Sequence, residues 1–451
     1  MALYLTVALV AIAVLLLIGT PVAFALGSVA SIMVLLFASP VHLGQFTQIA
    51  YSYGTSSNML IAPLFVLMAE FLSQGRIAED LFSAMSRKFG KLRSGLGIVT
   101  TLVTTLFASM CASSSATAAA IGRITIAEMI KSRYDPAFTV GIVMSGATLG
   151  IMIPPSIVLV FFGIITETSI AKLLMAGLLP GLMIAALLCI FILIRVKLNP
   201  KLVDTDVDLE VLARIQKLSG TLDKKAQPVF DGKKRLSDSA VLKIFAPMIL
   251  VILVLGSLYT GLALPNECAG VGAIGALIIV ILLRRFDMKM FENSLTAAAR
   301  TSVMIIFLTI CGFGLTYIIS YLGIASQIAN AIISSGANKW LVIILVYILW
   351  LILGSFMDPG SMVILTVPFL LSSLNSLGFD TIWIGVVSTL LVEVGMITPP
   401  TGLNLFVTKS ITDLSFGLLV RGALPFLLVF LVALILLTIF PQIALFLPSI
   451  M

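Results

Sequence analysis

The chain has 451 residues, of which 60% are hydrophobic and only 10% are charged, and its mean hydropathy is +1.19. Apolar stretches of about 20 residues recur along it, which indicates helices that cross a lipid bilayer and excludes an ordinary soluble domain. The net charge of +7 comes from Lys and Arg at the ends of these stretches, so nucleic-acid binding is not expected and the chain is predicted to be an all-α, polytopic membrane protein.

The first two apolar stretches, 2–18 and 22–37, have no Lys or Arg before them. This favours two retained spans over a cleaved signal peptide. Further along, Lys and Arg are concentrated in some stretches and absent from others (present in 76–93, 131–133, 195–243 and 284–300; absent from 39–56, 260–268 and 376–381). By the positive-inside rule, the basic stretches are expected on the cytoplasmic side.

Residues 78–92 have the pattern of an amphipathic helix. Apolar residues recur there at helical spacing and basic residues accompany them (Leu81, Phe82, Met85, Phe89 and Leu92; Arg87, Lys88, Lys91 and Arg93). Such a helix is expected to lie along the cytoplasmic surface of the membrane. It is either a plain surface helix or an arm that joins two parts of the membrane domain.

Segment 94–130 is apolar, has basic stretches on both sides and carries a run of serines at its midpoint. Both of its ends are therefore expected in the cytoplasm, and the segment forms either two short spans or a re-entrant hairpin. A hairpin tip exposes free amides, which favour a substrate carboxylate, and free carbonyls, which favour a small cation such as Na⁺. For any single hydroxyl, the alternative is a bond to its own helix. The polar residues around this tip are Ser109, Ser113, Ser114, Ser115 and Thr117.

Residues 150–156 contain a double proline, Pro154-Pro155, within apolar sequence. Two prolines remove backbone donors and stop a helix. In hydrocarbon, such a break is tolerated only where the backbone is buried in protein or lines a cavity. We therefore expect an unwound loop at about 146–156, in which Thr148 offers a hydroxyl and a carbonyl to an ion.

Residues 199–240 form the only long polar stretch, and apolar sequence flanks them on both sides. We interpret them as a solvated cytoplasmic linker without chemistry of its own. The linker divides the chain into a first membrane repeat at 1–198, which includes additional N-terminal spans, and a second membrane repeat at 241–451.

The second half repeats features of the first. Residues 395–401 are nearly a copy of 150–156, and the second double proline follows the first by 245 residues. Two weaker matches occur at nearly the same spacing (353–357 with 107–111, and 322–325 with 75–78). We infer an internal duplication, with a second hairpin at about 339–376 and a second unwound loop at about 395–401.

The two halves are expected to face opposite ways. Counting spans places 166–172 and 260–267 outside, and 199–240 and 284–300 inside. The second hairpin then opens to the outside, which makes the duplication an inverted-topology repeat. Helices broken at matching places in two such repeats are the best sequence indication of a transporter's substrate and ion site.

The second hairpin carries Ser355, Asp358, Gly360 and Ser361 near its midpoint. A carboxylate is expensive inside a membrane and is usually functional where it occurs. The alternative for Asp358 is a helix N-cap or a turn residue. Glu393 precedes the second double proline and either pairs with a lysine or faces a water-filled cleft; Thr398 and Thr401 lie in the loop itself.

Several kinds of catalytic site are missing from the sequence. It contains no Gly-x-x-x-x-Gly-Lys-Ser/Thr phosphate loop, no Gly-x-Ser-x-Gly and no His-Glu-x-x-His. With its single His42, a histidine-based metal or catalytic site is improbable. The cysteines are scattered and are interpreted as small hydrophobic residues (Cys111, Cys189, Cys268 and Cys311). An enzyme and a structural scaffold are both disfavoured, because neither needs a duplicated site in the middle of the membrane, and no cofactor is expected beyond a coupling ion.

At this point the sequence resembles a known family. Four segments look like the large membrane subunit of tripartite ATP-independent periplasmic (TRAP) transporters (113–122, 146–155, 264–269 and 395–400), and the similarity extends over nearly the whole chain. The resemblance implies an elevator-type, Na⁺-coupled importer of organic acids in the bacterial inner membrane. It also implies two partners: a periplasmic substrate-binding protein and a small four-helix membrane subunit, which is expected to be a separate polypeptide.

In this family the two hairpin tips and the two unwound loops form the substrate and Na⁺ sites. Carried onto this chain, the substrate candidates are Ser113, Ser114, Ser115, Thr117, Gly360, Ser361 and Thr401. The Na⁺ candidates are Ser109, Ser115, Gly146, Thr148, Pro154, Ser355, Asp358, Gly395, Thr398 and Pro399.

The sequence departs from the family pattern in two places. Leu264 and Asn266 stand where threonines are usual, and Glu393 stands where a neutral residue is expected. Glu393 puts a simple Na⁺ stoichiometry in doubt. The alternative function is a stand-alone Na⁺- or H⁺-coupled anion carrier of related fold that needs no binding protein.

Overall fold

The computed structural model describes residues 2–89, 94–111, 113–205, 238–334, 336–412 and 414–451. All regular structure in these residues is helical, and seven of the helices are long and apolar enough to cross a membrane. The helices are α1 (Ala2–Leu17), α2 (Val22–Phe37), η1 (Pro40–His42), α3 (Leu43–Gly54), η2 (Ser57–Leu60), α4 (Ile61–Gln74), α5 (Ile77–Phe89), α6 (Gly95–Cys111), α7 (Ser114–Lys131), α8 (Pro136–Gly150), α9 (Ile157–Thr166), α10 (Ile170–Leu198), η3 (Pro200–Val203), α12 (Asp238–Tyr259), α13 (Pro265–Leu282), α14 (Met288–Tyr321), α15 (Ile324–Ser334), α16 (Lys339–Phe356), α17 (Pro359–Ser376), α18 (Thr381–Met396), α19 (Leu403–Thr412), α20 (Phe416–Ile439) and α21 (Gln442–Ile450).

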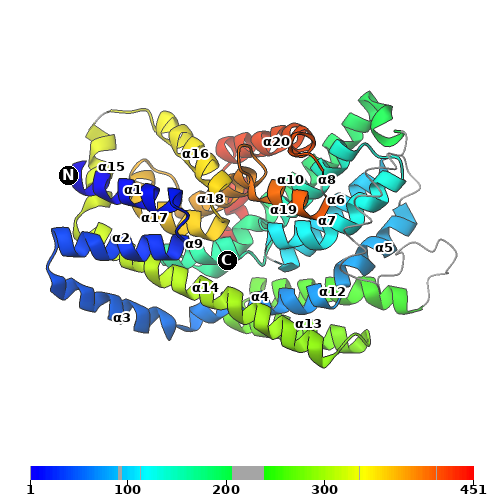
Figure 1. The fold of residues 1–451 in the computed structure, drawn as a ribbon, viewed down its shortest axis with the longest axis horizontal. Coiled ribbons are helices and arrows are strands. Elements are labelled where there is room, and N and C mark those ends of the chain that lie inside the picture. The colour runs from blue at the N-terminus through cyan, green and yellow to red at the C-terminus, as the bar shows by residue number, and fades with distance from the viewer. Residues whose placement is uncertain (1, 90–93, 112, 206–237, 335, 413) are drawn as a thin grey trace.

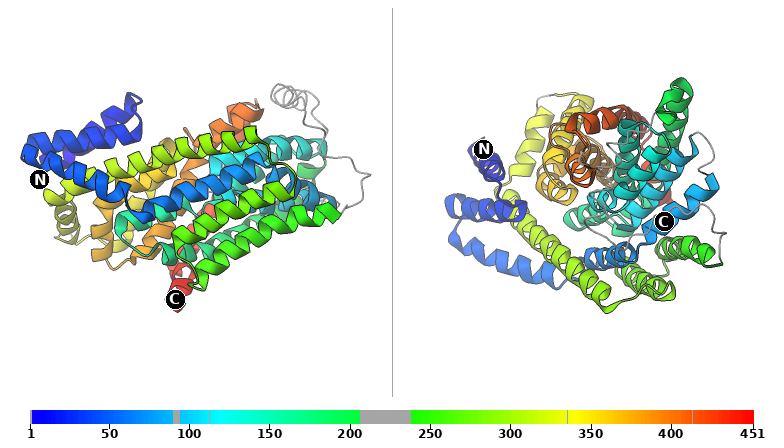
Figure 2. Two further views of the ribbon diagram at one scale, coloured as in Figure 1. Left: turned by 90° about the horizontal axis from the view of Figure 1, so that it is seen from below. Right: turned by 45° about the vertical axis from the view of Figure 1, so that its right-hand side comes forward.

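The helices form two groups (Figures 1 and 2). Helices α2, α3, α4, α12, α13 and α14 make a band along one side of the molecule, in which α4 packs against α13 and α14. Helices α6–α10 and α16–α20 make a compact group beside this band. Two short helices connect the groups along the chain: α5 leads from α4 to α6, and α15 leads from α14 to α16.

The expected duplication is visible in the backbone. Both connecting helices follow a residue in the left-handed conformation, Arg76 with φ of 55° before α5 and Gly323 with φ of 64° before α15. The helix pairs α6–α7 and α16–α17 occupy equivalent places, as do the broken helices α8–α9 and α18–α19. The weak sequence match of 322–325 with 75–78 therefore marks equivalent junctions.

In both repeats, a glycine at the end of the broken helix packs directly against the first helix of the pair. A Cβ placed on Gly150, at the end of α8, would lie 1.9 Å from the Cβ of Ala108 on α6. A Cβ placed on Gly395, near the end of α18, would lie 2.6 Å from the backbone carbonyl carbon of Gly354 on α16. In each half, the broken helix thus touches the first arm of the helix pair just before its tip.

The two helix pairs open toward opposite ends of α20. The turn that follows α7 is joined to the segment after α10, where the amide of Asp135 donates to the carbonyl of Leu202 at 2.9 Å, and Asp135 shares a cavity with the start of α20. The base of the second pair lies at the other end of α20, where the indole of Trp383 donates to the carbonyl of Leu437 at 2.8 Å. This is the arrangement that an inverted repeat requires.

Helices α8 and α18 extend further than the sequence predicted. The loops were expected at 146–156 and 395–401, but they run from 151 to 156 and from 397 to 402. Gly146, Thr148 and Gly395 are therefore helical. A proline lacks the N–H that would bond the carbonyl four residues earlier, so Pro154 removes the partner of Gly150 and leaves the preceding turns intact.

Two other predicted segments are described only in part. The amphipathic segment 78–92 corresponds to α5, in which Leu81 and Phe82 are fully buried against neighbouring helices; residues 90–92 lie outside the described residues. Of the polar linker 199–240, η3 covers its first turn and α12 begins at Asp238, whereas residues 206–237 also lie outside them.

Candidate functional site

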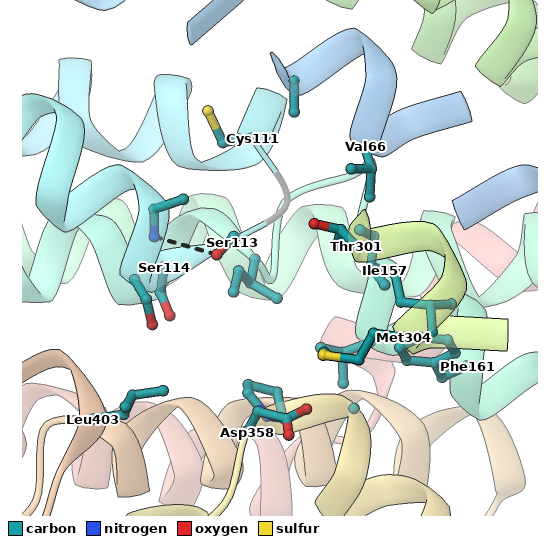
Figure 3. Close-up of a pocket in the computed structure, with 18 of the residues that line it drawn as sticks. Val66, Cys111, Ser113, Ser114, Ile157, Phe161, Thr301, Met304, Asp358 and Leu403 are labelled. Atoms are coloured by element: carbon teal, nitrogen blue, oxygen red, sulfur yellow. Dashed lines mark hydrogen bonds between the residues drawn. The ribbon is translucent and has the colours of Figure 1, made fainter. Parts of the chain in front are cut away.

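Four helices begin at one cavity of about 330 Å³ in the compact group (Figure 3). Residues at the starts of α7, α9, α17 and α19 line it, and these include Ser114, Ile157, Pro359 and Leu403. Two of the helices belong to each repeat. The N-terminal end of a helix carries unpaired amides and a partial positive charge, which favour an anion. None of the described residues that line the cavity is Lys or Arg.

Side chains cap three of these four helices. Ser113 accepts a hydrogen bond from the amide of Ala116 at 3.3 Å, and Ser156 accepts one from the amide of Leu159 at 3.3 Å. Asp358 caps α17: its carboxylate accepts the amide of Ser361 at 3.0 Å and the hydroxyl of Ser361 at 2.5 Å. The N-cap alternative considered for Asp358 is thus the observed local role, while Asp358 also lines the cavity.

The opposite wall comes from the band of long helices. Glu70 and Ser73 on α4 line the cavity. Thr301 and Met304 on α14 also line it, and Figure 3 shows them across from the tip residues Ser113 and Ser114. Glu70 was not among the predicted site residues, although the rule that singled out Asp358, that an acid inside a membrane span is usually functional, applies to it as well. Two carboxylates, Glu70 and Asp358, therefore line a cavity whose helix ends attract anions.

The second proline loop is bonded to the second tip. The hydroxyl of Thr401 and the amide of Gly402, the latter at 3.1 Å, both donate to the carbonyl of Ser355. The hydroxyl of Ser355 donates to the carbonyl of Ile352 in its own helix at 2.7 Å, and that of Thr398, in the loop, donates to the carbonyl of Val394 in the last turn of α18 at 2.6 Å. Because these hydroxyls act as donors, their oxygen lone pairs remain available, whereas the carbonyl of Ser355 already accepts two hydrogen bonds.

Asn404 connects the two repeats behind the tips. Its side-chain carbonyl accepts the hydroxyl of Ser115 at 3.0 Å, and its amide nitrogen lies 3.3 Å from the hydroxyl of Thr148. Asn404 is fully buried. It was not predicted, although an Asn directly after the second proline loop, in apolar sequence, was a signal that could have identified it.

Five of the predicted site residues line the cavity: Ser113, Ser114, Ser115, Asp358 and Gly360. The others lie outside its lining, among them the buried Thr117, whose hydroxyl donates to the carbonyl of Ser113 at 2.9 Å. The remaining residues outside the lining are Ser109, Gly146, Thr148, Pro154, Ser355, Ser361, Gly395, Thr398, Pro399 and Thr401. The structure thus separates a group at the cavity from a group behind the tips.

Glu393 lies on α18, one turn before the second proline loop, and is only 2% exposed. Neither of its carboxyl oxygens has a hydrogen-bond partner among the described residues. Of the two expectations for Glu393, neither a lysine partner nor a place in the cavity lining is seen in that part of the chain. A buried carboxyl without a protein partner is costly unless something else, such as a cation, satisfies it.

Comparison with known proteins identifies the family. The family model described as "Tripartite ATP-independent periplasmic transporter, DctM component" matches residues 9–443. The C4-dicarboxylate TRAP transporter large permease protein DctM of Pseudomonas aeruginosa is 33% identical over 94% of this chain and 93% of its own length. The protein of the same name from Vibrio cholerae is 29% identical, over 96% and 95%.

The fold also has a neighbour among solved structures. The Neisseria gonorrhoeae MtrF efflux pump superposes with a TM-score of 0.55 at 13% identity, over 89% of this chain and 83% of that chain. This shows a shared helical fold. The family match spans nearly the whole chain, and its members are transporter permeases rather than enzymes. The chain therefore belongs to the DctM family, the large permease subunits of tripartite ATP-independent periplasmic transporters.

Proposed function

We propose that this permease imports an organic acid anion across the bacterial inner membrane by a Na⁺-coupled elevator mechanism. The observation that carries the proposal is the convergence of four helix N-termini, two from each repeat, on one cavity. Their amides offer binding to a carboxylate without a fixed basic side chain. The two relatives are named for C4-dicarboxylates, so succinate is the first substrate to test.

Oxygen atoms behind the tips support the choice of Na⁺ as the coupling ion. The helices that precede the tips, α6 and α16, end there, as do α8 and α18 at the proline loops. The last carbonyls of a helix have no partner within it and can turn toward an ion, although that of Ser355 also accepts bonds from Thr401 and Gly402. Asp358 adds a carboxylate at the second tip, and its N-cap bonds use only part of its capacity to accept hydrogen bonds or ligate an ion. Oxygen ligands of this kind suit a small hard cation, and no other cofactor is needed.

The division into two groups supports an elevator. The substrate cavity lies where the compact group meets the band, so that Glu70 and Thr301 form a wall that would be left behind if the compact group moved. Helices α5 and α15 link the groups, and each follows a residue in the left-handed conformation, where the chain changes direction. Helices that link the groups in this way could act as hinged arms.

Family membership implies two partners for the permease, a periplasmic binding protein that delivers the substrate and a small membrane subunit. We propose that the small subunit is the separate four-helix polypeptide expected from the sequence. The exposed apolar side chains on α14 and α16, such as Val303 and Ile348, are suited to contact with lipid or with another membrane helix.

The test separates the charge of Asp358 from its capping role. In proteoliposomes that contain the complete transporter, Asp358→Ser keeps an N-cap but removes the carboxylate, whereas Asp358→Ala removes both. Asp380→Ala is the matched control, because Asp380 caps α18 through the amides of Ile382 and Trp383, at 2.8 and 3.2 Å, and does not line the cavity. Loss of a cap costs about 1 kcal/mol of stability.

The expected result is that Asp358→Ser unfolds like the wild type but loses Na⁺-driven succinate uptake, while Asp380→Ala loses stability and keeps uptake. Unchanged Na⁺ dependence in Asp358→Ser would exclude Asp358 as an ion ligand. Uptake of succinate by this subunit without the binding protein would instead support the alternative of a stand-alone carrier.

A further inference from the structure

A second cavity, of about 860 Å³, lies where helices α8 and α20 begin and α10 ends. None of the residues that line it lines the substrate cavity. Arg195 of α10 and Arg421 of α20 both face it, next to the polar side chains of Asn199 and Ser415. The ion pairs seen in the described residues involve neither of these arginines. Two arginines without acidic partners in one cavity indicate a site for an anion.

The guanidinium of Arg195 is held in place but is not satisfied. Its Cζ lies 5.9 Å from the centre of the Phe191 ring, and Phe191 packs edge-on against Phe426 at 5.1 Å between ring centres. Phe426 in turn contacts Phe138, with 6.0 Å between ring centres, and both of these rings line the cavity. The Nε of Arg195 is buried and has no hydrogen-bond acceptor in the described structure. A guanidinium that is partly buried and lacks an acceptor is costly, which favours a ligand that offers acceptors to its terminal nitrogens.

The remaining groups around the cavity favour a phosphate. The planar guanidinium of arginine binds phosphate oxygens in pairs, and the N-terminal end of α20 adds a partial positive charge, since Ser415 caps it without introducing a negative one. One acid, Asp135, lines the same cavity. Its carboxylate accepts the amide of Phe138 at 2.8 Å and so caps α8.

The position of the cavity favours a lipid as the source of the phosphate. Lys131, Arg133 and Lys201 lie at the same end of the molecule, which the positive-inside rule assigns to the cytoplasm. Beside the cavity, α10 and α20 expose apolar side chains of the kind that face acyl chains, including Leu193, which is 47% exposed, and Leu428, which is 60% exposed. A basic cavity between membrane helices on the cytoplasmic side is suited to an anionic headgroup.

We propose that Arg195 and Arg421 bind the phosphate of an anionic phospholipid of the cytoplasmic leaflet, with its acyl chains along α10 and α20. Both helices belong to the compact group that carries the substrate cavity. The site does not depend on the coupling ion or the transport mechanism proposed above. A bound lipid would stabilise the folded permease by mass action.

The test is thermal unfolding of the purified permease in a neutral detergent, titrated with short-chain phosphatidylglycerol. Parallel titrations use short-chain phosphatidylcholine, which has no net charge, and inorganic phosphate. The variants are Arg195→Gln, Arg421→Gln and the double variant. Lys197→Gln is the matched control, because it removes the same charge from the same helix and Lys197 does not line this cavity.

Phosphatidylglycerol is expected to raise the unfolding temperature of the wild type and of Lys197→Gln in a saturable way. The double variant should need at least ten times more lipid for the same shift, since each charge-assisted hydrogen bond to phosphate is strong. Stabilisation by inorganic phosphate alone would keep the phosphate site and exclude lipid as its source. Equal shifts in wild type and double variant, equal shifts with both lipids, or no shift with any ligand would overturn the proposal. If Arg195→Gln does not fold, Arg421→Gln carries the test, because the side chain of Arg421 is exposed.

Discussion

Substituting Gly150 by alanine should separate α6 from α8 at the back of the first hairpin tip. The added Cβ would lie 1.9 Å from the Cβ of Ala108 and 2.7 Å from its Cα and carbonyl carbon. These atoms belong to a helix backbone and cannot rotate away, so α6 must shift as a whole. Overpacking of a tight core costs about 1–3 kcal/mol, and the short distances to backbone place Gly150→Ala at the upper end of that range.

The assay compares apparent unfolding temperatures and succinate uptake for Gly150→Ala and Gly256→Ala. Gly256 lies within α12, and a Cβ placed there meets nothing within 4 Å, so its substitution should stabilise the helix by about 0.5–1 kcal/mol. Adding Ala108→Gly to Gly150→Ala should restore only part of the loss, because the backbone of residue 108 stays close. If Gly150→Ala unfolded at the same temperature as Gly256→Ala and transported normally, the inferred contact between α6 and α8 would be wrong.

Three further substitutions test other contacts. Glu393→Gln should unfold at no lower temperature than the wild type in Na⁺-free buffer, because the carboxyl has no hydrogen-bond partner among the described residues; loss of a buried ion pair would instead cost about 3–5 kcal/mol. The stabilisation of this variant by NaCl should be smaller than that of the wild type, which titrations of the unfolding temperature with NaCl and with choline chloride would measure. Arg285→Ala should weaken the junction of α4 and α5, where Arg285 binds the carbonyl of Gly75 at 2.7 Å and Asp80 at 2.8 Å. The rate of succinate uptake should fall by a larger factor than the affinity for succinate. Trp350→Phe should cost about 1–3 kcal/mol in unfolding experiments, because the buried indole donates to Thr366 at 2.9 Å inside the second helix pair.

The sequence predicted the elements that depend on local chemistry. Double prolines stop helices wherever they occur, so the two breaks and their equivalence could be read directly. The pairing of 322–325 with 75–78 also marked a real equivalence, because both segments change direction at a left-handed residue. The ends of α8 and α18 were predicted too early. A proline removes only the hydrogen bond to the carbonyl four residues before it, so the helix can continue up to that residue.

The candidate site was predicted at its tips and missed at its walls. Runs of serine and an isolated aspartate stand out in apolar sequence, and Ser114 and Asp358 do line the cavity. Glu70 and Asn404 each stand out as a polar residue in apolar sequence. Their place at the site, however, depends on how α4 and α19 pack against the tips, which no local pattern gives.

The cavity contains groups that attract opposite charges, and this favours coupled rather than single binding. Four helix N-termini attract an anion, while the carboxylates of Glu70 and Asp358 line the same space. An organic anion alone would be repelled by the carboxylates, and a cation alone would be repelled by the positive helix ends. Each ligand therefore makes binding of the other more favourable. Because such a coupling free energy is reciprocal, we infer that Asp358→Ser should weaken succinate binding more in NaCl than in choline chloride. Equal weakening in both salts would assign Asp358 to the substrate rather than to the ion.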